Sequence, residues 1–295
     1  MVAPEPPVVF AASEEGADLD DGWPYLRDAL IAAGVAPSVA FWDDPTVQWE
    51  SFALVVSVFV WGYVTRRAQF LAWVDKVDPS APMVNPAPVL RWNSDKTYLA
   101  DLAAEGIPIV PTRWVPPGAD WEPPSEDYVI KPSVASGGIG AARYRGLPVN
   151  VADRHVLRLH EEGYTVMVQP YQSNVDDAGE ASLIYIGGHY SHAINKAAML
   201  QADVGVADRL WERQVITSVE PRNEQRTLAE TVMRSVHRRF GPTGYGRIDL
   251  VDGSDGHPRV LEVELVEPSL FLVHAPEAAI DFANHLYVLA GDWLP

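Results

Sequence analysis

The first third of the chain alternates short apolar runs with helical patterns. Residues 8–12 and 52–59 are almost entirely apolar, as expected for strands that are covered on both faces. Residues 23–33 and 66–77 instead repeat apolar positions at helical spacing. With a further strand at 38–42, this order is typical of βαβ units and predicts a small open parallel sheet, an α/β fold.

The proline-rich stretch DPSAPMVNPAPVLRWN, residues 78–93, interrupts this pattern. Proline removes a backbone donor and disfavours a helix before it, so the stretch is the best candidate for a linker. We therefore expect a first domain at residues 1–88 and a second domain at residues 89–295.

After the linker the pattern changes to α+β, with antiparallel hairpins. Ser94 is expected to cap a helix that ends at Glu105, before Gly106. Residues 200–220 show no clear period and are expected to form a mobile loop. The other predicted elements are a helix from Asp153, a helix from Pro221 to about 240, and strands at 107–110, 128–131, 165–169, 182–186, 190–195, 244–251 and 259–265.

Charge and composition narrow the class of partner. The formal net charge of −18, from 22 basic and 40 acidic residues, disfavours binding to nucleic acid or to an anionic membrane. The chain has no cysteine, which excludes disulfides, thiolate nucleophiles and zinc–thiolate sites. The N-terminal residues lack the features of a signal peptide, and the longest apolar stretch, 52–64, is too short to cross a bilayer. We expect a soluble, cytoplasmic protein, and the sequence leaves a homodimer open.

A glycine cluster follows Lys131 in the stretch VIKPSVASGGIGAARY, residues 129–144. The cluster lacks the Lys-Ser/Thr ending of a P-loop, and its glycines do not have the spacing of a dinucleotide-binding loop. Glycines allow backbone N–H groups to converge on an anion, and a nearby ammonium group supplies charge. The same residues also suit a surface hairpin, which is the simpler interpretation of the glycines alone.

Three carboxylates lie on two predicted strands near the C-terminus. Residues two apart on a strand share a face, so Glu262 and Glu264 point the same way, and Asp249 on the preceding strand completes the group. Such a group is costly in an apolar hairpin unless cations neutralise it, and Mg²⁺ prefers carboxylate and phosphate oxygens. Arg247, on the same face as Asp249, would bind an anion. The alternative is a solvated outer face with an Arg–Glu pair.

In this order the motifs resemble those of the ATP-grasp superfamily of carboxylate–amine ligases, over about residues 90–272. The stretches 89–96, 187–194 and 264–271 look most like the ATP-grasp enzymes of natural-product pathways, including those that form D-cycloserine. The resemblance implies an ATP-grasp fold with an N-terminal Rossmann-like pre-ATP-grasp domain and a lid subdomain at about 112–170. It also implies ATP and Mg²⁺ as cofactors.

The resemblance further implies roles in binding ATP. Lys96, Lys131 and Lys196 match the basic residues that contact the phosphates. The flap that closes over the phosphates corresponds to Ser136, Gly137, Gly138, Ile139 and Gly140. The hinge that binds adenine corresponds to Gln169, Pro170 and Tyr171, and the acidic residue that contacts ribose corresponds to Glu180.

The resemblance implies a metal site and an acyl site as well. Asp249 and Glu262 match the metal ligands of relatives, whereas Glu264 replaces an asparagine. Because both side chains offer an oxygen, Mg²⁺ binding should be retained. Arg247 matches the arginine that contacts the activated acyl group, and Ser269 falls where relatives have a loop that binds a substrate carboxylate.

One segment departs from the relatives. Residues 58–60 are apolar where relatives have a polar run, and the segment belongs to the domain that contributes to the substrate pocket. Trp61 and Tyr63 follow it and are candidates for lining that pocket, although aromatic core packing explains them equally well. The identity of the substrate is therefore open.

The activity implied is that of a Mg-ATP-dependent ligase or cyclase acting on a small amino-acid-like substrate. Its carboxylate would be activated as an acyl phosphate for attack by a nitrogen nucleophile, with release of ADP and phosphate. The nitrogen belongs either to the same molecule, as in ring closure, or to a second amino acid or peptide. A third interpretation, a nucleotide-binding protein without catalysis, fits poorly with three basic and three acidic matching positions.

Overall fold

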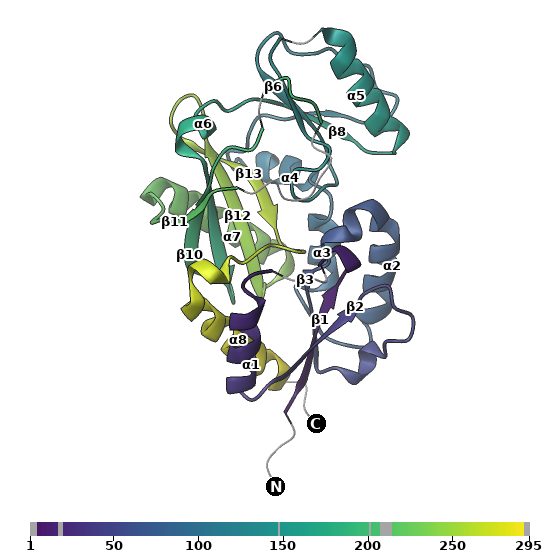
Figure 1. The fold of residues 1–295 in the computed structure, drawn as a ribbon, viewed down its shortest axis with the longest axis vertical. Coiled ribbons are helices and arrows are strands. Elements are labelled where there is room, and N and C mark those ends of the chain that lie inside the picture. Colours follow the sequence, from purple (N-terminus) through teal and green to yellow (C-terminus); the bar gives the residue numbers. More distant parts are fainter. Residues whose placement is uncertain (1–4, 17–19, 147, 201, 207–213, 292–295) are drawn as a thin grey trace.

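Three sheets follow one another along the long axis of the molecule in the computed structural model (Figure 1). The structure describes residues 5–16, 20–146, 148–200, 202–206 and 214–291. The first sheet lies at the bottom of Figure 1, the central sheet in the middle and the third sheet at the top. The predicted combination of an α/β part and an α+β part is confirmed.

The first sheet is parallel throughout and has the strand order β2-β1-β3-β4. Its strands are β1 (Pro7–Ala12), β2 (Ala36–Phe41), β3 (Leu54–Phe59) and β4 (Met83–Val84). Every residue of β3 is buried because helices cover both faces of the sheet, which explains its continuous apolar sequence. Helix α1 (Trp23–Ala32) packs on one face, and α2 (Arg67–Val77) and α3 (Ala87–Asn93) pack on the other.

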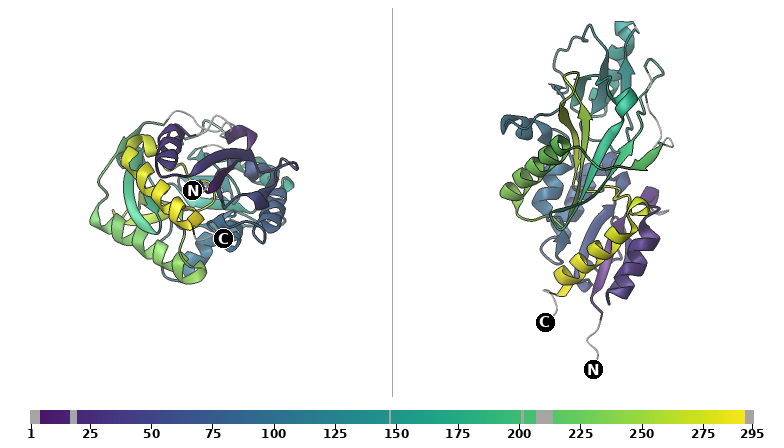
Figure 2. Two further views of the ribbon diagram at one scale, coloured as in Figure 1. Left: turned by 90° about the horizontal axis from the view of Figure 1, so that it is seen from below. Right: turned by 90° about the vertical axis from the view of Figure 1, so that its left-hand side faces the viewer.

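The C-terminal helix α8 (Pro276–Gly291) returns to this first sheet. Figure 2 shows it beside α1, and its side chains Phe282 and Leu286 share a buried core with Leu26 and Phe10. This helix was not predicted, because no clear pattern marks an element after residue 265. One face of the first sheet is therefore covered jointly by α1 and by the far end of the chain.

The linker expected at residues 78–93 is wrong. The stretch contains β4, which extends the first sheet, and α3, which packs against it. Asn85 and Asn93 are both buried, and both hydrogen-bond backbone groups of the β12–β13 hairpin and its flanks. The prolines interrupt regular secondary structure in this stretch but do not make it flexible, because hydrogen bonds from asparagine side chains join it to the central sheet.

The central sheet is antiparallel and has the strand order β11-β10-β9-β12-β13. Its strands are β9 (Glu180–Ile186), β10 (His189–Lys196), β11 (Ile216–Ser218), β12 (Tyr245–Asp252) and β13 (Pro258–Glu264). Helices α4 (Tyr98–Ala104) and α7 (Asn223–Phe240) bury one face. The opposite face carries the charged residues described below.

The third sheet is also antiparallel and has the order β5-β8-β6-β7. Its elements are β5 (Arg113–Val115), β6 (Tyr128–Pro132), β7 (Ala142–Tyr144), β8 (Val166–Pro170) and the covering helix α5 (Val149–Glu161). The short α6 (Val175–Ala178) leads from β8 to the central sheet. These strands fall within residues 112–170, and the movement of that region as a lid stays a prediction.

Several local expectations are corrected. Ser94 does not cap α4, because it ends α3: its hydroxyl donates to the Arg91 carbonyl at 3.0 Å. Helix α5 begins at Val149, four residues before Asp153. The expected strand 107–110 makes only an isolated bridge, and β11 lies within residues 200–220, of which 201 and 207–213 are outside the described residues.

Short 3-10 helices occupy Glu14–Gly16, Trp49–Ser51, Trp61–Arg66 and Leu272–His274. In the part of the chain that the structure describes, no helix combines the length and apolar character needed to cross a membrane.

We expect Asn85→Ala to lower the free energy of unfolding by about 2–4 kcal/mol. The side-chain amide of Asn85 donates to the carbonyls of Tyr245 at 2.9 Å and Leu265 at 2.7 Å, and its oxygen accepts from the Gly244 N–H at 2.9 Å. The backbone φ of 59° also suits asparagine better than alanine. Urea unfolding measures the change. Asn284→Ala, at an exposed position of α8, is the matched control, and an equal effect of both substitutions would contradict the prediction.

Candidate active site

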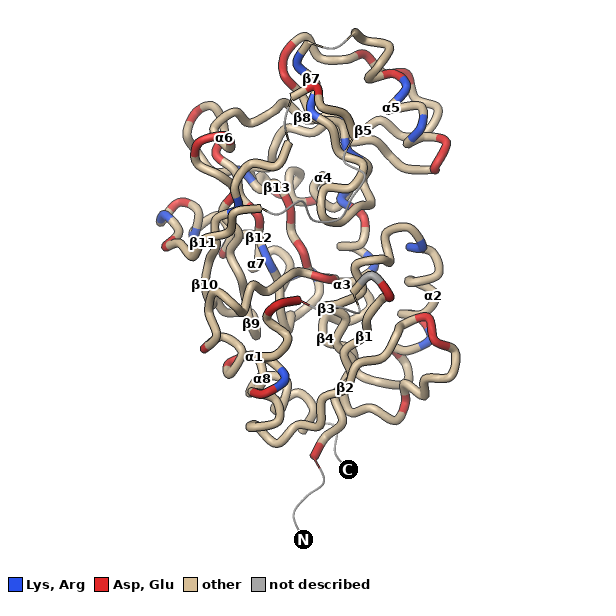
Figure 3. The backbone as a smooth tube through the Cα atoms, viewed as in Figure 1, with Lys and Arg blue, Asp and Glu red and all other residues tan. Residues whose placement is uncertain are grey.

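A cavity of about 220 Å³ lies where the three sheets meet. The 3-10 helix that follows β3 contributes Trp61, the third sheet contributes Lys131, and the central sheet contributes Glu262. Three of the four lysines of the chain line this cavity, together with Arg247 and five acidic residues. In Figure 3 the acidic residues of β13 lie in the middle of the molecule, between the third and first sheets. Among the described residues, every buried lysine, arginine, aspartate and glutamate except Arg143 lines this cavity.

Strand register explains how these charges meet. Arg247 pairs with Glu264 and Asp249 with Glu262 across β12 and β13, as predicted for the hairpin. Glu180 and Lys196 pair in the same way across β9 and β10. Alternation along the strands turns these side chains away from α7, toward the cavity. The alternative of a solvated outer face is excluded, because Arg247 and Asp249 are 5% and 2% exposed.

The buried ion pairs form one network. The Arg247 Nε lies 2.8 Å from Asp249 Oδ1, and its Nη2 bonds both Asp249 and Glu264. Lys196 Nζ lies 3.0 Å from Asp249 Oδ2 and also bonds Glu180. Pairing of this kind offsets part of the cost of removing charges from water.

Lys96 belongs to the same side of the cavity. Its Nζ lies 2.9 Å from Glu262 Oε1 and also donates to the Ala135 carbonyl in the glycine-rich loop. Lys96 thus links the carboxylates of β13 to the loop that follows Lys131.

Burial shifts the protonation of the acidic residues. Burial raises the pKa of Glu180 and of Glu264 to about 7, although Lys196 and Arg247 oppose the shift. Burial also disfavours the charge of Asp249, but Arg247 and Lys196 outweigh it and hold the pKa of Asp249 below its usual range. Extra cations would stabilise the ionised forms of Glu180 and Glu264.

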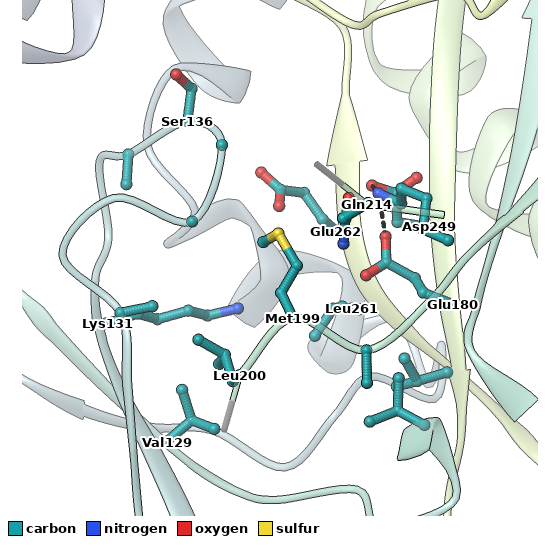
Figure 4. A pocket seen from close by; sticks show the side chains of 18 of the residues that line it. Val129, Lys131, Ser136, Glu180, Met199, Leu200, Gln214, Asp249, Leu261 and Glu262 are labelled. Carbon is teal, nitrogen blue, oxygen red and sulfur yellow. Dashed lines mark hydrogen bonds and ion pairs between the residues drawn. The ribbon is translucent and has the colours of Figure 1, made fainter. Parts of the chain in front are cut away.

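Lys131 differs from the other two lysines of the cavity. In the described part of the structure its ammonium group makes no hydrogen bond and no ion pair, and burial lowers its pKa to about 8. Figure 4 shows its side chain extending into the cavity from β6, with Glu262 pointing in from the opposite wall. An unpaired lysine in this position suits an anionic ligand.

The glycine-rich loop closes one side of the cavity. Gly137, Gly138 and Gly140 have φ angles of 58°, 77° and 76°, which glycine adopts without strain. A Cβ on Gly138 would lie 2.9 Å from the Met199 side chain, and the Ser136 hydroxyl donates to the Trp61 carbonyl at 3.3 Å. The loop therefore lies against both the central sheet and the first sheet. Gly140 itself is not among the residues that line the cavity.

The end of the cavity beyond Lys131 is largely apolar. Gln169, Pro170 and Tyr171 line it at the end of β8, as the resemblance implies, and Glu180 lies on the adjoining wall. Its apolar walls were not predicted from the sequence, and they include Val110, Val129, Met199, Leu200 and Leu261. A slot with apolar walls and a hinge of backbone groups can hold a flat heterocyclic base.

Asp249, Glu262 and Glu264 could hold a divalent metal ion. One oxygen of each lies within 4.8 Å of the others. Three carboxylate oxygens are the hard donors that Mg²⁺ requires, and phosphate oxygens complete its usual shell. The residues present therefore fit the metal. When the metal binds, Arg247 would have to give up some of its hydrogen bonds to Asp249 and Glu264.

The end of the cavity toward the first sheet is lined by Trp61, Ser269, Phe271 and Glu267. Phe271 and Glu267 were not singled out, because they follow β13 and lie outside its alternation. Tyr63 does not line the cavity: it is 4% exposed and packs on Phe70 with ring centroids 4.7 Å apart. Tyr63 is therefore part of the aromatic core and not of the substrate pocket. All other predicted site residues except Gly140 line the cavity.

Known proteins with related sequences identify the family. The family description "D-cycloserine synthetase DcsG, N-terminal domain" matches residues 8–85. The chain is 38% identical over 282 residues to the cycloserine biosynthesis protein DcsG of Streptomyces lavendulae, a match that covers 91% of this chain and 93% of that protein. The chain belongs to the DcsG family of ATP-grasp ligases. It is therefore a ligase enzyme.

Solved structures agree with the DcsG family. A crystal structure of D-cycloserine synthetase DcsG matches with a TM-score of 0.88 and 34% identity, covering 96% of this chain and 99% of that chain. The ATP-grasp ligase PsnB, solved with a minimal precursor, Mg and ADP, matches with a TM-score of 0.59 and 16% identity over 96% and 98% of the two chains. The second match shows the ATP-grasp fold alone.

We expect the affinity for AMPPNP with Mg²⁺ to fall about tenfold between pH 7 and pH 9. Lys131 is charged below its pKa of about 8, and above it the neutral amine must take up a proton before it can pair with a phosphate. Calorimetric titrations at several pH values measure both the affinity and the proton uptake. Lys131→Arg stays charged over this range and should remove most of the dependence, leaving only the part that Glu180 and Glu264 contribute as they ionise near pH 7. A pH-independent affinity in the unmodified protein would contradict this role.

Proposed function

We propose that this DcsG-family ligase uses Mg-ATP to activate the carboxylate of a small amino-acid-like substrate, which a nitrogen atom of the same molecule then attacks to close a ring. The observation that supports this best is that one cavity brings these features together. Apolar walls, the unpaired Lys131, a group of three carboxylates and the further acid Glu267 all line it. The similarity to D-cycloserine synthetase DcsG, at 34% identity, supports ring closure.

In the first step an oxygen of the substrate carboxylate attacks the γ-phosphorus of ATP. The bond to the β-phosphate oxygen breaks, so an acyl phosphate forms and ADP is released. Phosphoryl transfer depends mainly on positioning and on neutralising charge. We assign Lys96, Lys131 and Lys196 to the phosphates, because all three ammonium groups line the cavity.

In the second step the nitrogen lone pair attacks the acyl carbon. A tetrahedral intermediate forms, the nitrogen loses a proton, and the carbon–oxygen bond to phosphate breaks. Arg247 is suited to stabilise the negative oxygen of the intermediate, because its guanidinium group is buried and held in place by Asp249 and the Ser269 carbonyl. An intramolecular nitrogen requires only that the cavity hold the substrate in a folded conformation.

Asp249, Glu262 and Glu264 would hold Mg²⁺, which neutralises the charge of the triphosphate when bound. The balance of charges in the cavity supports this assignment. Four basic residues face five acidic ones, so a polyanionic nucleotide needs further positive charge.

We expect Lys131→Ala and Glu262→Gln each to reduce ADP release at least a hundredfold while leaving the unfolding midpoint almost unchanged. The first removes a phosphate contact, and the second removes a charge from the proposed metal ligands. A coupled assay for ADP, run beside thermal unfolding, measures both quantities. Lys76→Ala and Glu50→Gln, at exposed positions outside the cavity, are the matched controls. Normal ADP release in either site variant would refute the assignment.

Ring closure predicts that a single compound supports ADP release. We would test amino-acid derivatives that carry a nitrogen nucleophile, one at a time and in pairs. Release with one compound, together with a cyclic product in mass spectrometry, is the expected result. A requirement for two compounds together would favour ligation between molecules, and binding of ATP without any ADP release would contradict the activity.

A further inference from the structure

Glu267 is an acidic residue of the cavity to which the proposed reaction gives no role. It lies three residues after β13, is 7% exposed and lines the cavity. Among the described residues its carboxylate makes no hydrogen bond and no ion pair. Each of the other four acidic residues of the cavity pairs with a lysine or an arginine. Glu267 is thus a buried acid that faces the cavity without a partner.

The backbone around Glu267 is held firmly. The Trp61 indole N–H donates to the Glu267 carbonyl at 2.9 Å. The carbonyl of Val266 accepts from the hydroxyls of Tyr245 at 3.0 Å and Ser57 at 3.1 Å. These contacts join the loop to β3, to the 3-10 helix that follows β3 and to β12, so the backbone that carries the carboxylate is positioned before any ligand arrives.

A buried carboxylate without a cation is costly. Burial and the nearby Glu264 raise the pKa of Glu267 well above its usual range, although Lys96 and Arg247, neither of which forms an ion pair with it, oppose the shift. The group of carboxylates suited to a metal consists of Asp249, Glu262 and Glu264 and does not include Glu267. The missing cation is therefore best supplied by the substrate.

Ser269 lines the same cavity as Glu267 and is a second polar residue at this end of it. Its hydroxyl donates to the Asp20 carboxylate, which leaves its oxygen lone pairs available as acceptors. The Ser269 carbonyl accepts from Arg247 Nη1 at 3.2 Å, so Ser269 adjoins the expected acyl site. A loop that binds a substrate carboxylate was expected here, but the acids Asp20 and Glu267 beside Ser269 favour a positive group.

We propose that Glu267, together with the Ser269 hydroxyl that Asp20 orients, binds the ammonium group of the substrate. An ammonium group offers three donors, and in an amino acid it lies on the carbon next to the carboxyl group. Arg247 and Glu267 would thus hold the two ends of one amino-acid unit. The inference rests on the proposed ligase function, and it assigns Glu267 to the selection of substrates with a free amino group.

The test compares D-cycloserine, which has a free amino group, with N-acetyl-D-cycloserine, in which that group is blocked. Calorimetry in the presence of Mg-ADP measures binding to the unmodified protein, to Glu267→Gln and to the control Glu50→Gln. We expect the unmodified protein and the control to bind D-cycloserine roughly tenfold to hundredfold more tightly than the blocked compound. Glu267→Gln should lose this preference and still bind AMPPNP within about twofold of the unmodified protein.

Two results would overturn the inference. One is an unmodified protein that does not prefer D-cycloserine over its N-acetyl derivative. The other is a Glu267→Gln variant that keeps the preference. Substrate kinetics add a second readout, because the loss of a binding contact raises KM more than it lowers kcat.

Failure of the inference and failure of the ligase proposal give different patterns. ADP release with free and N-acetylated substrates alike would remove the role of Glu267 and leave the ligase activity in place. A preference for free amino groups that depends on Glu267, without ADP release from any compound, would support the binding site and refute the activity.

Discussion

The pairing of β12 with β13 is the constraint on which the site depends. It sets Arg247 opposite Glu264 and Asp249 opposite Glu262, on a face that the third sheet and the glycine-rich loop shield from water. Charges in such surroundings are costly unless each has a partner. A slip of one residue in this register would turn the carboxylates toward the apolar core around α7 and would remove both the ion pairs and the proposed metal site.

In the site without ligands, most charged side chains form ion pairs. The charged side chains without an ion-pair partner indicate where ligands bind. Arg247, Lys96 and Lys196 are held by carboxylates, whereas Lys131 and Glu267 have no partner among the described residues. One unpaired group is a cation beside the apolar slot, and the other is an acid beside the first sheet. A nucleotide phosphate and a substrate ammonium group would complete these two positions, so the order of charges along the cavity matches the order of groups in the proposed ternary complex.

The first sheet takes part in the site because it is tied to the central sheet. Asn85 and Asn93 reach across to the backbone near β12 and β13, and the Trp61 indole holds the loop that carries Glu267. Helix α8 packs on the same sheet after the chain has passed through the other two. The substrate end of the cavity is therefore built from segments about 200 residues apart in sequence.

Period-two and helical patterns in the sequence determined much of the fold. They predicted the parallel first sheet, the hairpin that carries Asp249, Glu262 and Glu264, and the position of Lys131 before a glycine loop. These features depend on near neighbours, because alternation along a strand decides which side chains share a face. Tertiary structure alone decided that residues 78–93 are held in place, that Tyr63 joins the core and that Glu267 faces the cavity unpaired. Those outcomes depend on residues that are distant in sequence. Local periodicity contains no information about such contacts.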